Sequence, residues 1–117
     1  MDAGREKFGA LIRREREAKQ IGLREMSKKI GVSPTYLSKV ERDEFPPPAE
    51  DKVRKIGGVL GLDADELLAL AGRVGSDLTD IIRERPREMA DLLRAAKGLT
   101  AEDMARLARQ AQKAREK

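Results

Sequence analysis

The sequence predicts an all-α fold, and three observations indicate it. Apolar residues recur three and four positions apart along the chain, which is the period of helices that bury one face. Aromatic residues make up only 3% of the 117 residues and tryptophan is absent, so the core has to be built from Leu, Ile, Val, Met and Ala. Glycines and prolines interrupt the pattern where short helices would end or begin. These features indicate a small helical bundle of one domain, with room for an appended element.

The first expected helix covers residues 5 to 20, and its apolar residues fall on one face. Phe8, Leu11 and Ile12 are spaced to reach the core, with Ala18 near the end of the same face. The charged residues between them would face water. Ile21 follows as an apolar plug in the turn.

Two short helices that meet across Gly31 are predicted in the stretch LREMSKKIGVSPTYLSKVER. Each carries apolar residues at helical spacing, Met26 and Ile30 on the first and Leu37 and Val40 on the second. Because glycine has no Cβ, it can take the left-handed conformation that ends a helix. We interpret the stretch as a helix-turn-helix.

The turn and the two helix starts carry residue types that suit their positions. Val32 can fill the corner of the turn, and Ser33 is a good N-cap for the second helix. Pro34 would occupy the first helical position, where its missing N–H costs no hydrogen bond. Gly22 can cap the first helix of the pair, and Ser27 supplies the small side chain that steeply crossing helices require.

This pattern resembles the Cro/Xre family of bacterial and phage repressors. The family motif reads roughly Q-x-x-hydrophobic-A-x-x-hydrophobic-G-V-S, followed by a recognition helix that ends hydrophobic-x-x-hydrophobic-E-R-G. The matching residues here are Leu23, Met26, Ser27, Ile30, Gly31, Val32, Ser33, Leu37, Val40, Glu41 and Arg42. The resemblance implies a five-helix, lambda-repressor-like DNA-binding domain over residues 5 to 72, and it stops there.

The resemblance also implies a pair that holds the recognition helix in place. Arg16 is expected to pair with Glu41, because a partly buried, fork-shaped guanidinium–carboxylate contact fixes geometry well. The alternative is that the two are unrelated surface charges. Leu23 stands where many members carry glutamine, and leucine cannot form that residue's hydrogen bonds to the DNA backbone.

Double-stranded DNA is the partner that the resemblance implies, with the helix from Pro34 to Glu41 in the major groove. Lys39 is the best candidate for a guanine contact, and Pro34 can offer only apolar contact, for instance to a thymine methyl. Tyr36 has the alternative role of covering the edge of the core. The predicted DNA-binding residues are Arg24, Ser33, Pro34, Thr35, Tyr36, Ser38, Lys39 and Arg42, and the residues structural to the motif are Arg16, Met26, Ser27, Gly31, Leu37, Val40 and Glu41.

Within this set, Arg24 and Arg42 are expected to contact phosphates. Arg24 lies beside the start of the helix that Gly22 caps, where unpaired N–H groups attract anions. Asp43 and Glu44 replace the glycine that usually follows Glu-Arg in the family. Two carboxylates beside phosphates would be repelled, so we expect both to point away from DNA.

The rest of the domain is predicted from its turns. Pro46, Pro47 and Pro48 are expected to stop the third helix and stiffen the turn that follows. A fourth helix over residues 49 to 60 carries Val53, Ile56 and Leu60, and its Gly57-Gly58 pair suggests that another backbone approaches closely. A fifth helix over residues 64 to 71 would be capped by Asp63 and ended by Gly72.

A helical extension is predicted over residues 73 to 117. Ser76 can cap one short helix, Pro86 can begin a second that Gly98 ends, and Thr100 with Asp103 forms a capping box for a third. The apolar faces of these helices are narrow, and such helices need a packing partner. We expect residues 76 to 117 to form a homodimer interface, with a cap on the same domain as the alternative.

Composition limits the remaining possibilities. The net charge of +4 and a pI near 9.6 permit nucleic-acid binding. The chain has no histidine and no cysteine, which excludes triads and zinc sites built on those residues, so we expect neither an enzyme nor a cofactor or metal. Without an apolar run of about 18 residues or a signal-like N-terminus, we expect no membrane contact and a cytoplasmic location of bacterial or phage type, on the nucleoid when bound to DNA.

These inferences lead to one principal function and one rival. The principal prediction is a dimeric transcriptional regulator, a repressor that binds a palindromic operator and that a regulatory protein partner could inactivate. The rival is an adaptor or coactivator that uses the same scaffold to bind protein.

Overall fold

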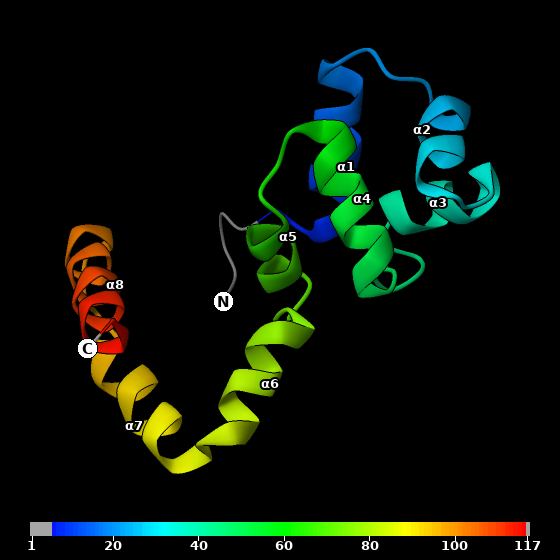
Figure 1. The fold of residues 1–117 in the computed structure, drawn as a ribbon. Coiled ribbons are helices and arrows are strands. Elements are labelled where there is room, and N and C mark those ends of the chain that lie inside the picture. The colour runs from blue at the N-terminus through cyan, green and yellow to red at the C-terminus, as the bar shows by residue number, and fades with distance from the viewer. Residues whose placement is uncertain (1–5, 117) are drawn as a thin grey trace. The chain divides into compact units, whose positions relative to one another are not determined.

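The computed structural model describes residues 6 to 116, and within that range eight helices and no strand occur. The all-α prediction is therefore confirmed. The chain divides into two compact units between Ser76 and Asp77, and each is described by itself. The helices labelled in Figure 1 are α1 (Phe8–Ala18), α2 (Leu23–Ile30), α3 (Pro34–Glu41), α4 (Glu50–Leu60), α5 (Ala64–Leu70), α6 (Ser76–Glu84), α7 (Pro86–Ala96) and α8 (Ala101–Arg115).

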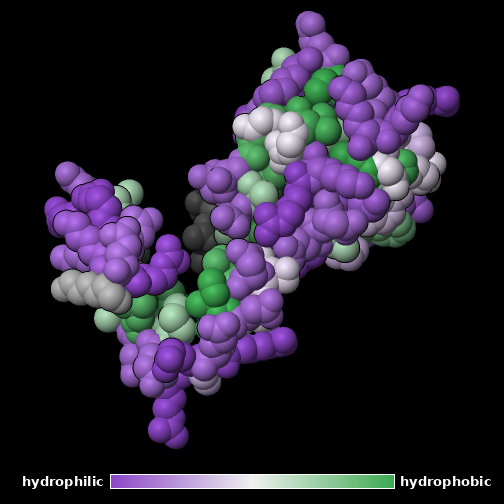
Figure 2. All heavy atoms as spheres, viewed as in Figure 1, coloured by the Kyte–Doolittle hydropathy of each residue, from purple (hydrophilic) through white to green (hydrophobic). Residues whose placement is uncertain are grey.

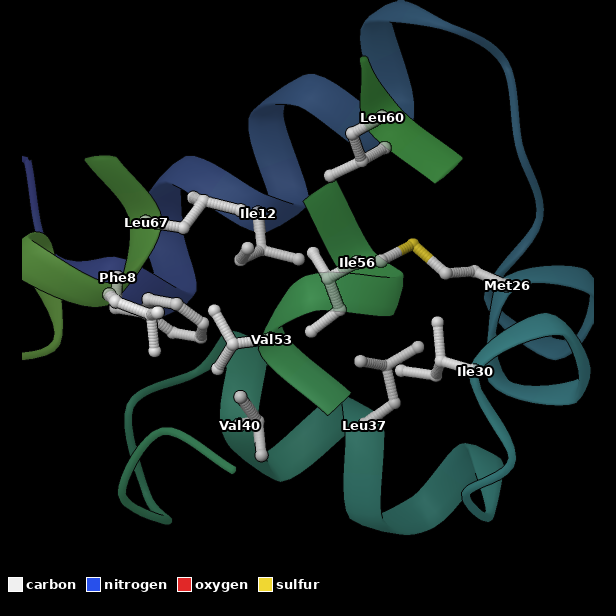
Figure 3. Packing of buried hydrophobic residues seen from close by; sticks show 11 residues of the cluster. Phe8, Ile12, Met26, Ile30, Leu37, Val40, Val53, Ile56, Leu60 and Leu67 are labelled. Atoms are coloured by element: carbon white, nitrogen blue, oxygen red, sulfur yellow. The ribbon is translucent and has the colours of Figure 1, made fainter. Parts of the chain in front are cut away.

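Helix α4 is central to the packing of the first unit. It packs against α1, α2 and α5, and α3 packs against α1 and α2. Figure 3 shows Met26 and Leu37 directed toward Ile56 of α4, so the two helices of the motif share one core with the rest of the unit. The buried apolar side chains of this core are Phe8, Ile12, Met26, Ile30, Leu37, Val40, Val53, Ile56, Leu60, Leu67 and Leu68.

The turn between α2 and α3 has the conformation that the sequence predicted. Gly31 has a φ of 79°, in the left-handed region. Ser33 caps α3 by accepting a hydrogen bond from the Tyr36 N–H at 3.1 Å, and Pro34 occupies the first helical position. Ser27 is buried, and its hydroxyl donates to the Arg24 carbonyl at 2.8 Å. Helix α3 therefore begins at a fixed point relative to α2.

Several helix ends differ from the predicted ones. Helix α1 begins only at Phe8 and ends at Ala18, because Gln20 adopts a left-handed φ of 57°, and Ala18 is exposed rather than directed to the core. Residue 5 of the predicted helix lies outside the described range.

The prolines do not stop α3, which ends earlier in a turn where Asp43 has a φ of 58°. Helix α4 begins after Ala49, and α5 ends before Ala71.

The predicted close approach at the glycine pair of α4 is confirmed for one glycine and wrong for the other. A Cβ on Gly57 would lie 2.9 Å from the Leu62 carbonyl oxygen and 3.4 Å from a Leu67 methyl carbon. A Cβ on Gly58 would meet nothing within 4 Å. Gly57 therefore lets the turn before α5 pack directly on α4, whereas Gly58 has no such role.

The end of the first unit is tied to the segment that precedes and begins α4. Arg73 donates to the Pro47 carbonyl at 2.6 Å. The predicted cap role of Ser76 is wrong, because Ser76 is the first residue of α6. Its backbone N–H instead donates to the Glu50 carboxylate at 3.1 Å. These contacts attach the last residues of the first unit to the segment before α4 and to its first residue.

The second unit consists of helices that bury little apolar surface. None of the residues in α6, α7 and α8 is buried. Pro86 begins α7, and Thr100 with Asp103 forms the predicted capping box of α8. Figure 2 shows apolar side chains at the surface of this unit. The large apolar residues that are at least 40% exposed here are Leu78, Ile81, Leu92, Leu93, Leu99, Met104 and Leu107. No helix within residues 6 to 116 is long and apolar enough to cross a membrane.

Candidate nucleic-acid interface

The exposed start of α3 and the start of α2 border one shallow hollow on the surface of the first unit. The hollow has a volume of about 580 Å³, and its lining residues are Gly22, Leu23, Arg24, Glu25, Pro34, Thr35, Ser38 and Arg42. Five of the eight predicted DNA-binding residues lie in this lining. We call this surface the α2–α3 hollow.

Two helix N-termini contribute to the α2–α3 hollow. Gly22 is the N-cap of α2, and Pro34 is the first residue of α3. The first N–H groups of a helix have no partner within it and carry a partial positive charge, which favours an anion. No capping side chain occupies the start of α2, whereas the Ser33 hydroxyl already accepts from the Tyr36 N–H. The start of α2 is therefore the more open anion-binding end.

Guanidinium groups add positive charge to the hollow. Arg24 and Arg42 are both exposed there. Arg42 also lines an adjoining hollow of about 210 Å³ together with Arg13, a basic residue outside the predicted DNA-binding set. Helix periodicity alone could not indicate Arg13, because its position depends on how α1 packs against α3.

Glu44 forms an exposed ion pair with Arg42. Its carboxylate lies 3.2 Å from the Arg42 guanidinium, and both side chains are about half exposed. The carboxylate of Glu44 therefore pairs with the guanidinium that is predicted to contact a phosphate. Asp43 has a different partner, since its carboxylate accepts a hydrogen bond from the Gly9 backbone N–H at 3.1 Å.

Tyr36 and Lys39 form a separate group with Phe45 and do not line the α2–α3 hollow. The Lys39 ammonium lies over the Phe45 ring, 5.1 Å from its centroid, and the Tyr36 and Phe45 ring centroids are 5.8 Å apart. Tyr36 is half-buried and packs against the core, as its alternative role anticipates. Lys39 is also half-buried rather than fully extended into solvent.

A buried ion pair holds the other end of α3. Arg16 donates from Nε and Nη2 to the two carboxylate oxygens of Glu41, at 2.8 and 2.9 Å, and its Nη1 donates to the Ile21 carbonyl at 2.8 Å. The pair that the resemblance implies is therefore present. The hydrogen bond to Glu41 raises the pKa of Arg16, whereas desolvation opposes this shift. The guanidinium consequently stays charged over the whole working range of pH.

The remaining motif residues lie in the interior. Met26, Ser27, Leu37 and Val40 are at most 1% exposed. Leu23 is half-buried, packs against the core and also lines the hollow. Within residues 6 to 116 no group of three His, Cys, Asp or Glu residues could hold a metal ion.

Comparison with known proteins assigns this chain to a family. The family model described as helix-turn-helix domain matches residues 7 to 70. Two curated relatives, from two strains of Mycobacterium tuberculosis, are uncharacterized HTH-type transcriptional regulators. Each is 33% identical over 76 residues, which cover 65% of this chain and 54% of the relative. The chain thus spans about half the length of the curated relatives that it matches.

Solved structures with a similar chain include SinR, the master regulator for biofilm formation, in complex with DNA. That chain is 33% identical, the match covers 52% of this chain and 97% of that one, and the TM-score is 0.48. The clp gene regulator ClgR from Corynebacterium glutamicum is 24% identical, with coverage of 77% and 89% and a TM-score of 0.49.

Proposed function

The chain belongs to the helix-turn-helix domain family, and from this premise we propose that it is a transcriptional regulator that binds double-stranded DNA in a sequence-specific manner. The observation that carries the proposal is the α2–α3 hollow. It gathers two helix starts, the Arg24 and Arg42 guanidinium groups, and the polar side chains of Thr35 and Ser38 on one exposed surface. Such a surface suits a DNA backbone that leads the start of α3 into the major groove.

In this proposal the two groups of residues have different tasks. Arg24, Arg42 and the start of α2 bind phosphates, which sets position without reading sequence. Thr35 at the start of α3 reads base edges, and Lys39 does so one turn later. Lys39 has to leave Phe45 to reach a guanine. A cation–π contact is worth about 0.5 to 2 kcal/mol, depending on its exposure. A good guanine contact discriminates against the wrong base by roughly 1 to 3 kcal/mol, which is enough to offset the loss of the Phe45 contact on the cognate site.

We further propose that the regulator acts as a dimer on a palindromic operator. One short recognition helix contacts few base pairs, whereas two helices related by a two-fold axis read half-sites about 34 Å apart. The exposed apolar residues of α6 to α8 support an interface between copies in residues 76 to 117, because the unit covers few of them itself. A repressor role follows from the resemblance to operator-blocking proteins.

The first test measures binding of the full chain to a random-sequence duplex by fluorescence anisotropy over a series of salt concentrations. We expect binding at low salt that weakens steeply as salt rises, because each phosphate contact releases counterions. Absence of salt-sensitive binding would contradict the proposal and favour a protein-binding adaptor. A selection of bound duplexes from a random library then supplies the cognate site.

Substitutions separate the two proposed tasks. Lys39→Ala should cost about 1 to 3 kcal/mol, mainly on the cognate site. Arg42→Ala should weaken binding to all duplexes and lower the slope of log K against log salt by about one. Lys55→Ala is the matched control, since Lys55 is an exposed cation on α4 outside the hollow. If Lys39→Ala and Arg42→Ala both bind like Lys55→Ala, the assignment of contacts is wrong.

A further inference from the structure

Helix α1 begins without a capping side chain of its own. Its N-cap residue, Lys7, makes no side-chain hydrogen bond to the helix. The N–H of Gly9, the second residue of the helix, has no partner within the helix at that position. The Asp43 carboxylate accepts it at 3.1 Å, although Asp43 lies 34 residues further along the chain. A side chain from the turn after α3 therefore supplies the capping hydrogen bond at the start of α1.

Asp43 makes this bond from a backbone conformation that L-residues rarely adopt. Its φ is 58°, and its own N–H donates to the Val40 carbonyl at 3.0 Å. Glycine adopts the left-handed region without a Cβ penalty, whereas aspartate is tolerated there at some cost. The backbone alone would therefore favour glycine at this position. The hydrogen bond from the Gly9 N–H explains why an aspartate, and not a glycine, suits position 43.

The first turn of α1 also touches the end of α3 directly. A Cβ on Gly9 would lie 2.1 Å from the Val40 carbonyl oxygen and 2.8 Å from that of Glu41, so only glycine allows this approach. About two turns further along α1, Arg16 holds the Glu41 carboxylate. The end of α3 is thus attached to α1 at two points about two turns apart along α1, and this separation limits how far that end can swing along α1.

We propose that Asp43 is a positioning residue for DNA reading: its carboxylate caps the start of α1 from the α3 turn, and this bond sets the direction in which α3 presents its base-reading residues. The inference rests on the proposed function. Phosphate contacts tolerate a small tilt of α3 because they follow charge, whereas contacts to base edges require alignment. Loss of the cap should therefore reduce the preference for the cognate site more than the affinity for random duplex.

The test compares Asp43→Gly with Asp43→Asn in the full chain. Asparagine keeps an acceptor oxygen and tolerates the left-handed conformation, while glycine relieves the backbone and removes the acceptor. We expect Asp43→Gly to speed hydrogen exchange of the Gly9 amide by roughly threefold to tenfold, the usual effect of one lost cap on a folding equilibrium. We expect the ratio of cognate to random affinity to fall by up to the same factor, because the cap cannot contribute more free energy to DNA reading than it contributes to the fold. Asp43→Asn should keep most of the wild-type affinity ratio and most of the protection of the Gly9 amide.

Glu44→Gln is the matched control, because it removes a neighbouring carboxylate that pairs with Arg42 and does not cap α1. It should leave the Gly9 amide and the affinity ratio unchanged. If Asp43→Gly keeps the wild-type ratio and Gly9 exchange rate, Asp43 has no positioning role, and the proposed function is unaffected. If wild-type protein binds no duplex, both the proposed function and this role in DNA reading are overturned, whereas Gly9 exchange still reports the cap itself.

Discussion

At the scale of single residues, the two ion pairs at the end of α3 differ in burial. The side chains of Arg16 and Glu41 are 11% and 3% exposed, whereas those of Arg42 and Glu44 are 51% and 53% exposed. An exposed pair contributes at most about 1 kcal/mol and is screened by salt. Arg42 can therefore exchange Glu44 for a phosphate at little cost, while Arg16 and Glu41 remain paired.

Removal of one partner of the buried pair should be costly. Arg16→Met leaves the Glu41 carboxylate buried without its cation and the Ile21 carbonyl without its donor. Breaking such a pair typically costs about 3 to 5 kcal/mol, and we expect the lower end because Arg16 retains some solvent contact. Urea denaturation with an unchanged m-value measures the loss.

Two further variants make this prediction specific. Arg13→Met removes an exposed guanidinium paired with Glu17 on the same helix and should cost less than about 1 kcal/mol. The double variant Arg16→Met/Glu41→Met should be more stable than Arg16→Met alone, because no uncompensated buried charge remains. A double variant less stable than the single one would show that the two residues do not act as a pair.

At the scale of elements, local capping signals predicted the helices well. Ser33, Asp63 and Thr100 each accept a hydrogen bond from a backbone N–H three residues later, and all three had been assigned from sequence. Such signals work because cap and helix are neighbours in the chain. The Asp43 cap of α1 gave no such signal, since its partner lies 34 residues away and becomes adjacent only after α3 packs on α1.

The glycine pair of α4 offers a matched test within one element. Gly57→Ala should destabilise the protein by about 1 to 3 kcal/mol, because the new Cβ overlaps the Leu62 carbonyl and forces the backbone to move. Gly58→Ala meets open space and should stabilise by up to about 1 kcal/mol through its higher helix propensity. Thermal unfolding of both variants checks the prediction, which fails if the two midpoints shift in the same direction.

Glu50 at the start of α4 should make the free energy of unfolding depend on pH in the acidic range. Hydrogen bonding from the Arg54 guanidinium, aided by the Ser76 N–H and opposed by desolvation, holds the pKa of Glu50 below its ordinary value of 4.5. Because the folded-state pKa is depressed, this stabilisation is present above about pH 4.5 and is lost as pH falls through the folded-state pKa.

Urea denaturation between neutral and acidic pH measures this contribution. We expect Glu50→Gln to lower stability at neutral pH and to make the acidic decline shallower, because the substituted side chain cannot titrate. Arg54→Met should act in the same direction by removing the principal donor. Acidic declines parallel to that of wild type in both variants would contradict the role of Glu50.

At the scale of the whole molecule, sequence reasoning reached the helices and the motif but not the contacts between distant segments. The periodicity of Met26, Ile30, Leu37 and Val40 fixed which faces are buried, and all four are buried. The position of Lys39 over Phe45 and of Arg13 beside Arg42 depends on how helices and turns pack, which periodicity does not contain. The predicted DNA contacts remain predictions.

The second unit provides the test at this scale. Leu92 and Leu93 of α7 are 53% and 54% exposed, more than expected for leucines that a unit buries in its own core. If they meet a second copy, Leu92→Glu places a charge in an apolar interface and should dissociate the dimer, because a charge there is uncompensated. Sedimentation should then show wild type near twice the 13.0 kDa monomer mass and the variant near that mass.

Arg94→Glu separates this effect from a general effect of altered charge on α7. Arg94 is exposed and lies on the side of the helix opposite the apolar stripe of Met89, Leu92, Leu93 and Ala96, so this variant should remain dimeric. The alternative, in which the extension caps its own domain, predicts a monomeric wild type and a Leu92→Glu variant that loses stability without changing mass.

A dimer should also lose most of its cognate affinity when Leu92→Glu separates the copies, because two half-sites are then bound independently. A Leu92→Glu variant that stays dimeric and keeps cognate affinity would place the contact between copies outside this stripe.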